Sequence, residues 1–186
     1  MKRRKEKKHN TNPMHKSVMW AAKITCVTLA LSLVVSFITE LTSSKSNLVI
    51  SFLMLTLLII ISIIFDTIGV AATSCDIRRL LDAEIKKIKG AENAVKLVKN
   101  AEKVANICSD VIGDMCATIS GACAAAIVII YTANNPKQYV FNIIMSSLVA
   151  AVTVGGKAVF KLFAINKSQD IMLMCGKMIG VFLRKK

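Results

Sequence analysis

Four long apolar stretches constrain the fold of this chain more than any other feature of its sequence. They cover residues 17–39, 48–74, 105–131 and 139–164, and each reaches the roughly 17–25 residues that an α-helix needs to cross a bilayer. Within lipid a segment must satisfy its own backbone hydrogen bonds, which favours helices. With 54% apolar residues, the sequence predicts an all-α, multi-pass helical membrane protein.

The basic residues alternate between the ends of these stretches and predict an orientation. Of the 25 Lys and Arg residues, eight precede or enter the first stretch and eight lie between the second and third. Seven follow from Lys157 onward, and the two remaining connectors hold one each, Lys45 and Lys137. Cytoplasmic segments carry the excess of Lys and Arg. We therefore expect four spans in the cell membrane, with both termini cytoplasmic.

Residues 1–16 form a basic tail, and the net charge of the chain is +14. A nucleic-acid-binding arm has a similar composition. Beside an apolar stretch, however, such a run is typical of a topology determinant that contacts anionic lipid headgroups, so we expect the bilayer as partner and no nucleic acid. Residues 17–39 also resemble a signal peptide, but no A-x-A-like site follows them, which favours an uncleaved anchor.

Between the second and third stretches, residues 75–104 carry apolar residues at helical spacing on both sides of Gly90. This pattern predicts a cytoplasmic helical hairpin that lies under the membrane or against the bundle. The alternative is a solvated connector, which would not need the apolar stripe. Residues 168–184 predict a C-terminal juxtamembrane amphipathic helix that begins at Ser168. Its apolar face is marked by Ile171, Met174, Met178 and Phe182.

Three aspartates interrupt the apolar stretches at about the same predicted membrane depth. Asp66 lies about eight residues before the end of the second stretch, and Asp110 and Asp114 lie near the start of the third. Residues four apart project from one face of a helix. Since a carboxylate in hydrocarbon costs roughly 2.5–3.5 kcal/mol, these groups must face each other, a counter-charge or a cation.

Further oxygen atoms lie at the same predicted depth, on the side chain of Thr67 and on the backbone of Gly155 and Gly156. Glycines permit irregular backbone whose carbonyls coordinate ions. Oxygen-only ligands suit a hard cation such as Mg²⁺. The candidate metal ligands are Asp66, Thr67, Asp110, Asp114, Gly155 and Gly156.

Lys157 supports an alternative interpretation of the same cluster. It follows the glycine pair, and its ammonium group could neutralise Asp66 or Asp114 as an internal salt bridge. The cluster would then be a structural network, with Lys157 as its internal counter-ion. The side chain could also extend to the headgroups instead.

The last three stretches resemble the transmembrane domain of the cyclin-M/CorC magnesium transporters. The family patterns F-S-G-S-E-T-A-L-T-S, G-N-T-L-V-N and G-E-x-x-P-K-x-x-A correspond in part to FDTIGVAATS at 65–74, SDVIGD at 109–114 and GKAVFKLFA at 156–164. Both family asparagines stand here as aspartates, and Lys157 replaces the glutamate. The resemblance covers residues 48–186, so residues 17–39 would be an extra anchor.

This resemblance implies a function and partners. The matching positions would enclose Mg²⁺ as the transported ion, with Na⁺-coupled export, and the domain would form a homodimer. The nucleotide-binding CBS pair of the family has no counterpart in the sequence, so we expect no nucleotide and envisage a separate regulatory subunit. The alternative function is a non-transporting membrane scaffold or regulator, with Lys157 filling the former ion site. We expect no enzyme, since no nucleophile–base pair or phosphate-binding loop occurs in the sequence.

Overall fold

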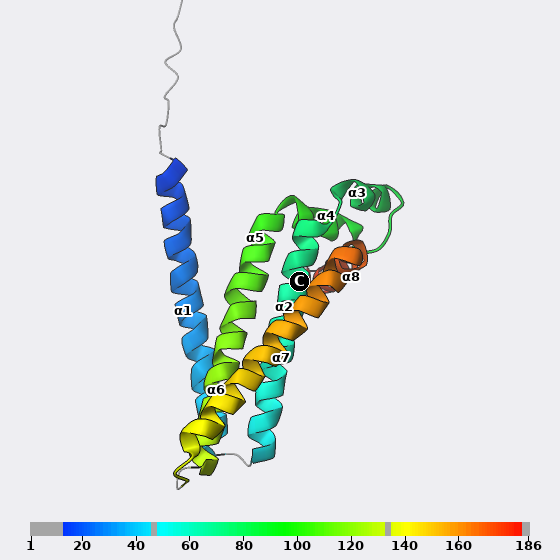
Figure 1. The fold of residues 1–186 in the computed structure, drawn as a ribbon. Coiled ribbons are helices and arrows are strands. Elements are labelled where there is room, and N and C mark those ends of the chain that lie inside the picture. Colours follow the sequence, from blue (N-terminus) through cyan, green and yellow to red (C-terminus); the bar gives the residue numbers. More distant parts are fainter. Residues whose placement is uncertain (1–12, 46–47, 133–134, 184–186) are drawn as a thin grey trace, which may run out of the picture.

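The computed structural model describes residues 13–45, 48–132 and 135–183, and this part of the chain is helical apart from short turns (Figure 1). It confirms the all-α fold class. Most of the basic tail predicted at residues 1–16 lies outside the described residues. The elements are α1 (Pro13–Lys45), α2 (Leu48–Ser74), α3 (Ile77–Ile85), α4 (Ala91–Lys99), α5 (Ala101–Ala105), the π-helical segment η1 (Asn106–Gly113), α6 (Asp114–Thr132), α7 (Gln138–Asn166) and α8 (Ser168–Leu183).

Within the described part of the chain, four helices are long and apolar enough to cross a membrane, as the sequence predicts. They contain the segments Trp20–Phe37, Leu48–Ser74, Ala101–Thr132 and Gln138–Asn166. The third segment joins α5, η1 and α6 and begins four residues before the predicted residue 105. The orientation of these helices in a bilayer stays a prediction.

Helices α2, α6 and α7 pack against one another and enclose most of the apolar core between the candidate spans. One group of buried side chains comprises Leu55, Cys123, Ala124, Ile127 and Val149. A second group comprises Leu58, Met115, Cys116 and Ile119.

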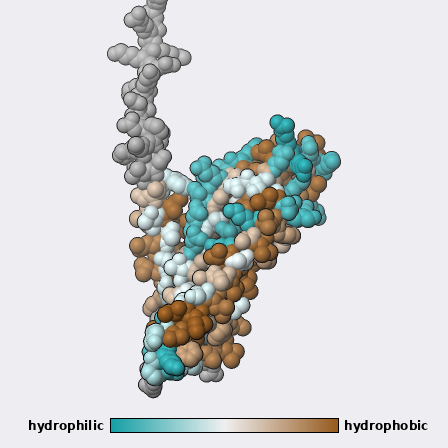
Figure 2. Space-filling model, in the orientation of Figure 1, coloured by the Kyte–Doolittle hydropathy of each residue, from teal (hydrophilic) through white to brown (hydrophobic). Residues whose placement is uncertain are grey.

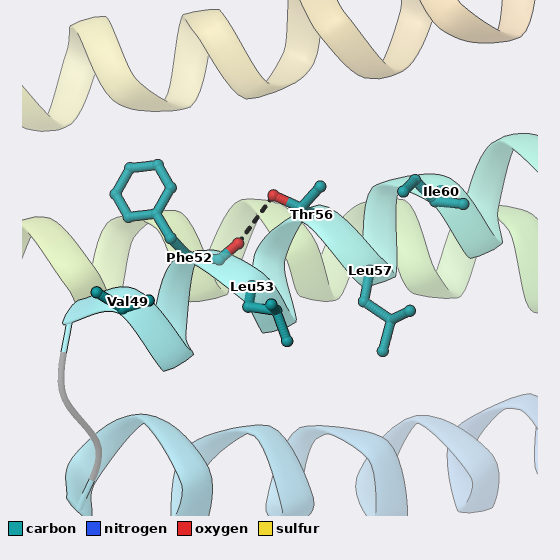
Figure 3. Close-up of a pocket in the computed structure, with 6 residues that line it drawn as sticks. All are labelled: Val49, Phe52, Leu53, Thr56, Leu57 and Ile60. Atoms are coloured by element: carbon teal, nitrogen blue, oxygen red, sulfur yellow. Dashed lines mark hydrogen bonds between the residues drawn. The ribbon is translucent and has the colours of Figure 1, made fainter.

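Helix α1 lies at the edge of this bundle (Figure 1). No residue of its apolar segment is buried, and side chains such as Phe37 are more than half exposed. The first half of α2 also presents apolar side chains, Phe52 and Leu57 among them, to an open groove of about 510 Å³ (Figure 3). Its polar member, Thr56, donates its hydroxyl proton to the Phe52 carbonyl at 2.9 Å. These faces suit contact with lipid, because the polar side chain that lines the groove, Thr56, is hydrogen-bonded within its own helix and needs no water.

The segment after α2 forms a packed hairpin. Asp76 caps α3 by accepting a hydrogen bond from Arg78 N at 2.9 Å, and Gly90, with φ of 90°, makes the turn into α4. A left-handed φ is readily available only to glycine. The hairpin packs against the end of α2 and against α8, in a buried cluster that α7 joins through Ala164, which excludes the solvated connector. The buried side chains of this junction are Ala71, Ala72, Leu80, Ala94, Val95, Ala164 and Met172.

Helix α8 begins at the predicted Ser168, only one residue after the end of α7. It contacts the hairpin through Met172 and Gly176, both of them buried. Met174 and Met178, on the predicted apolar face, are 64% and 62% exposed. These two methionines therefore point away from the protein, as expected for a helix at a membrane surface. Ile171, by contrast, packs against the buried cluster of the hairpin, and the side chain of Phe182 lies outside the described residues.

Candidate functional site

The predicted site residues come from three helices that run side by side (Figure 1). Asp66 and Thr67 lie in α2, Asp110 lies in η1, and Asp114 is the first residue of α6. Gly155, Gly156 and Lys157 lie in α7.

The backbone around Asp110 departs from the regular helix that the sequence predicts. Residues Asn106–Gly113 form a π-helical segment, whose wider turn changes the direction in which its side chains project. Such segments are rare and occur frequently at functional sites. The irregular backbone that Gly155 and Gly156 would permit does not form, since α7 continues as a helix through both.

Two hydrogen bonds attach η1 to α2. The buried Ser62 donates from Oγ to the Gly113 carbonyl at 2.6 Å, across the two helices. Ser109 donates from Oγ to the Asp66 carbonyl at 3.3 Å. Both bonds join a side chain to a main-chain carbonyl at the site, so they fix the backbone positions of Asp66 and Gly113.

Glycine makes this close approach of the two helices possible. A Cβ atom on Gly69 would collide with Ser109 Oγ. A Cβ atom on Gly113 would lie 3.2 Å from the Cys108 carbonyl and 3.4 Å from the Ser62 carbonyl. Small residues are typical of such interfaces between membrane helices.

Lys157 forms an ion pair with Asp114 across α7 and α6. The distance from Lys157 Nζ to Asp114 Oδ1 is 2.8 Å. The lysine side chain is 18% exposed and the aspartate side chain 66% exposed. The lysine side chain is therefore mostly covered by the helices, whereas the carboxylate keeps an open side.

The other two aspartates are not paired in this way. Asp66 is half-buried and Asp110 is exposed, and neither forms an ion pair with any residue that the structure describes. The three carboxylates also do not converge. Among the described residues, no group of three or more His, Cys, Asp or Glu side chains is placed to hold a metal ion.

The uncharged candidate ligands have other contacts. The buried Thr67 donates from Oγ1 to the Ile63 carbonyl at 2.6 Å, within its own helix. Gly156 faces the side chain of Ile63, while nothing lies within 4 Å of a Cβ atom built on Gly155. Of the predicted site residues, the structure thus joins only Asp114 and Lys157 directly.

Two serines hold the site together, and sequence reasoning missed one of them. The hydroxyl of Ser109 is predicted at the depth of the aspartates, whereas Ser62, four residues before Asp66, was not identified. A serine on the same helical face as an aspartate is a signal that could have found Ser62.

Comparison of the chain with family models, curated proteins and solved structures found no match. The resemblance to the cyclin-M/CorC family therefore rests on the three sequence motifs and stays a prediction.

Proposed function

We propose that this chain is a non-transporting membrane scaffold or regulator whose acidic site is neutralised by its own lysine. The observation that carries the proposal is the 2.8 Å ion pair between Lys157 and Asp114. Of the aspartates in the candidate site, Asp114 is the one with a direct lysine contact. The ammonium group takes the position next to this carboxylate that a bound cation would otherwise need.

The burial of the lysine supports this proposal. Its side chain is 18% exposed, so most of it is covered by the protein and is held in place beside Asp114. Breaking an ion pair by removing one partner is strongly destabilising when the other charge remains buried. Lys157 and Asp114 therefore stabilise the contact between α6 and α7 together.

Divalent cation transport is the second candidate, with Mg²⁺ as the transported ion. It is favoured by the charge balance of the site, where Asp66 and Asp110 lack an ion-pair partner in the described part of the chain. Carboxylates that stay charged near lipid favour a cation beside them. On this proposal Mg²⁺ would have to displace Lys157 from Asp114 and draw the carboxylates together, and a homodimer and Na⁺ coupling would follow from the family resemblance.

The substitution Lys157→Met separates the two functions. If the lysine is a permanent counter-ion, its removal leaves Asp114 uncompensated. We then expect a loss of about 1–3 kcal/mol of stability, less than for a fully buried pair because the carboxylate is partly exposed. The double variant Lys157→Met with Asp114→Asn should recover most of the loss, since no charge is left unpaired. Thermal unfolding of the purified protein in detergent measures both.

Lys161→Met is the matched control, because Lys161 lies one turn further along α7 and is exposed. It removes the same charge without breaking the described ion pair. A Mg²⁺ titration of each variant completes the experiment, since a ligand that binds the native state raises the melting temperature. A saturable rise in the wild type that strengthens in Lys157→Met, with no loss of stability, would contradict the scaffold proposal and support transport. Mg²⁺ flux into liposomes would then be the next measurement.

A further inference from the structure

A groove lined by two lysines lies where the hairpin meets α8, and none of the three aspartates of the candidate site lines it. Its volume is about 500 Å³. Lys89 and Asn93 line it from the hairpin side, and Lys177 and Val181 line it from α8. Figure 2 shows hydrophilic surface gathered at this end of the molecule, with hydrophobic patches between, and hydrophobic surface along the spans.

The two lysines are brought together by direct contact between backbones. A Cβ atom on Gly90 would lie 2.6 Å from Lys177 N, and one on Gly176 would collide with the Gly90 carbonyl. Because Lys89 is the neighbour of Gly90 in sequence, the two lysine side chains start from adjacent points of the groove. The position of Lys177 opposite Lys89 is thus set by glycine packing.

Neither lysine is neutralised by the protein. In the described part of the chain, Lys89 and Lys177 form no ion pair. Glu92, the acidic residue nearest in sequence on α4, is engaged by Lys96 at 2.6 Å instead. That contact, foremost the hydrogen bond from Lys96, lowers the pKa of Glu92 below its ordinary value. The groove therefore keeps two uncompensated positive charges.

A further hydrogen-bond donor faces the groove. Asn93 Nδ2 donates to the Gly176 carbonyl at 3.2 Å. A side-chain amide carries two N–H donors, so one of them is left for a ligand. Two ammonium groups and an amide N–H together provide donors without an opposing carboxylate, which is the chemistry that binds a phosphate group.

The position of the groove identifies the source of that phosphate. The hairpin and α8 are held at the ends of α2 and α7 by a shared buried cluster that includes Ala71, Ala164 and Met172. On α8, Met174, Met178 and Val181 recur at helical spacing and are each more than 60% exposed. An apolar face beside a basic groove at the ends of candidate spans matches an anionic lipid, whose acyl chains and headgroup are joined.

We propose that this groove binds the phosphate of an anionic phospholipid headgroup, through Lys89, Lys177 and the Asn93 amide. The test uses the full chain in detergent, titrated with short-chain phosphatidylglycerol while its melting temperature is followed. A saturable rise is expected. In the variant Lys89→Gln with Lys177→Gln, the apparent affinity should fall roughly 10- to 30-fold, since each lysine near an anionic surface contributes about a five-fold factor.

Lys99→Gln with Lys103→Gln is the matched control, because both lysines are exposed on the same segment and neither lines the groove. This control should bind as the wild type does, and Lys89→Arg with Lys177→Arg should retain most of the affinity. Two further titrations distinguish the source, one with short-chain phosphatidylcholine and one with inorganic phosphate. If either ligand raised the melting temperature as much as phosphatidylglycerol does, the assignment to an anionic lipid would be overturned. If the control variant lost as much affinity for phosphatidylglycerol as Lys89→Gln with Lys177→Gln, the groove would not be the binding site.

Discussion

At the scale of single residues, the contact between α2 and η1 depends on two serine hydroxyls and on two glycines, which have no side chain to keep the helices apart. Ser62 and Ser109 donate to carbonyls of the opposite helix, and Gly69 and Gly113 leave the space for that approach. A hydrogen bond between helices matters here because lipid offers no replacement partner. These residues therefore hold the acidic site, although none of them carries a charge.

Substitution Ser62→Ala should destabilise the protein by about 0.5–1.7 kcal/mol, the range measured for hydrogen bonds between membrane helices. The physical reason is that the Gly113 carbonyl loses its partner in a buried place. Thermal unfolding in detergent checks this value. Ser146→Ala is the control, since Ser146 is exposed and donates within its own helix to the Asn142 carbonyl. Equal melting temperatures for the two variants would contradict the proposed role of Ser62.

At the scale of elements, α4 and α8 approach each other more closely than side chains would allow. Gly176 is buried against the Gly90 carbonyl and the Ala94 backbone nitrogen. Gly155, in α7, has open space where a side chain would project. Two glycines inside helices of one chain thus have opposite environments.

Replacing these glycines by alanine should have opposite effects. Gly176→Ala forces a methyl group against backbone atoms that cannot move independently, and we expect a loss of about 1–3 kcal/mol. Gly155→Ala should leave the stability unchanged or raise it by up to about 1 kcal/mol, because alanine favours the helix. Unfolding by heat or denaturant compares the two. A destabilised Gly155→Ala variant would instead show that another chain or a lipid packs on Gly155.

At the scale of the whole molecule, the uneven charge along the chain predicts which end of the bundle faces the cytoplasm. The hairpin and its flanks carry eight basic residues, whereas the connector between α6 and α7 carries one, Lys137. The hairpin and that connector lie at opposite ends of the bundle (Figure 1). The structure thus separates the two regions, and the positive-inside rule assigns them to sides.

Cysteine labelling tests this orientation. In a background without the six native cysteines, Lys137→Cys should react with a membrane-impermeant maleimide on intact cells. Lys99→Cys, in the hairpin, should react only after the cells are opened. Both positions are exposed in the structure, so access to the reagent is limited by the membrane alone. The reverse pattern would place the termini outside.

Much of the fold could be predicted from the sequence, but little of the site geometry. The spans, the turn at Gly90 and the start of α8 at Ser168 follow from local patterns of apolar residues and caps. Asp110 and Asp114 were expected to project together from one regular helix, whereas η1 ends between them. The direction in which a side chain projects after a π-helical segment depends on the residues that pack against that segment. Against η1 these are Ser62 and Gly69 of α2.

The sequence by itself determined that the chain is helical and membrane-like, because apolar length and charge alternation act locally and need no knowledge of neighbours. Only the tertiary structure decided that Lys157 contacts Asp114 and that Lys89 and Lys177 line one groove. Both pairings join residues far apart in the chain, and they depend on how closely two helices approach. For the groove, that distance is set by Gly90 and Gly176, whose effect emerges only once the hairpin and α8 are packed.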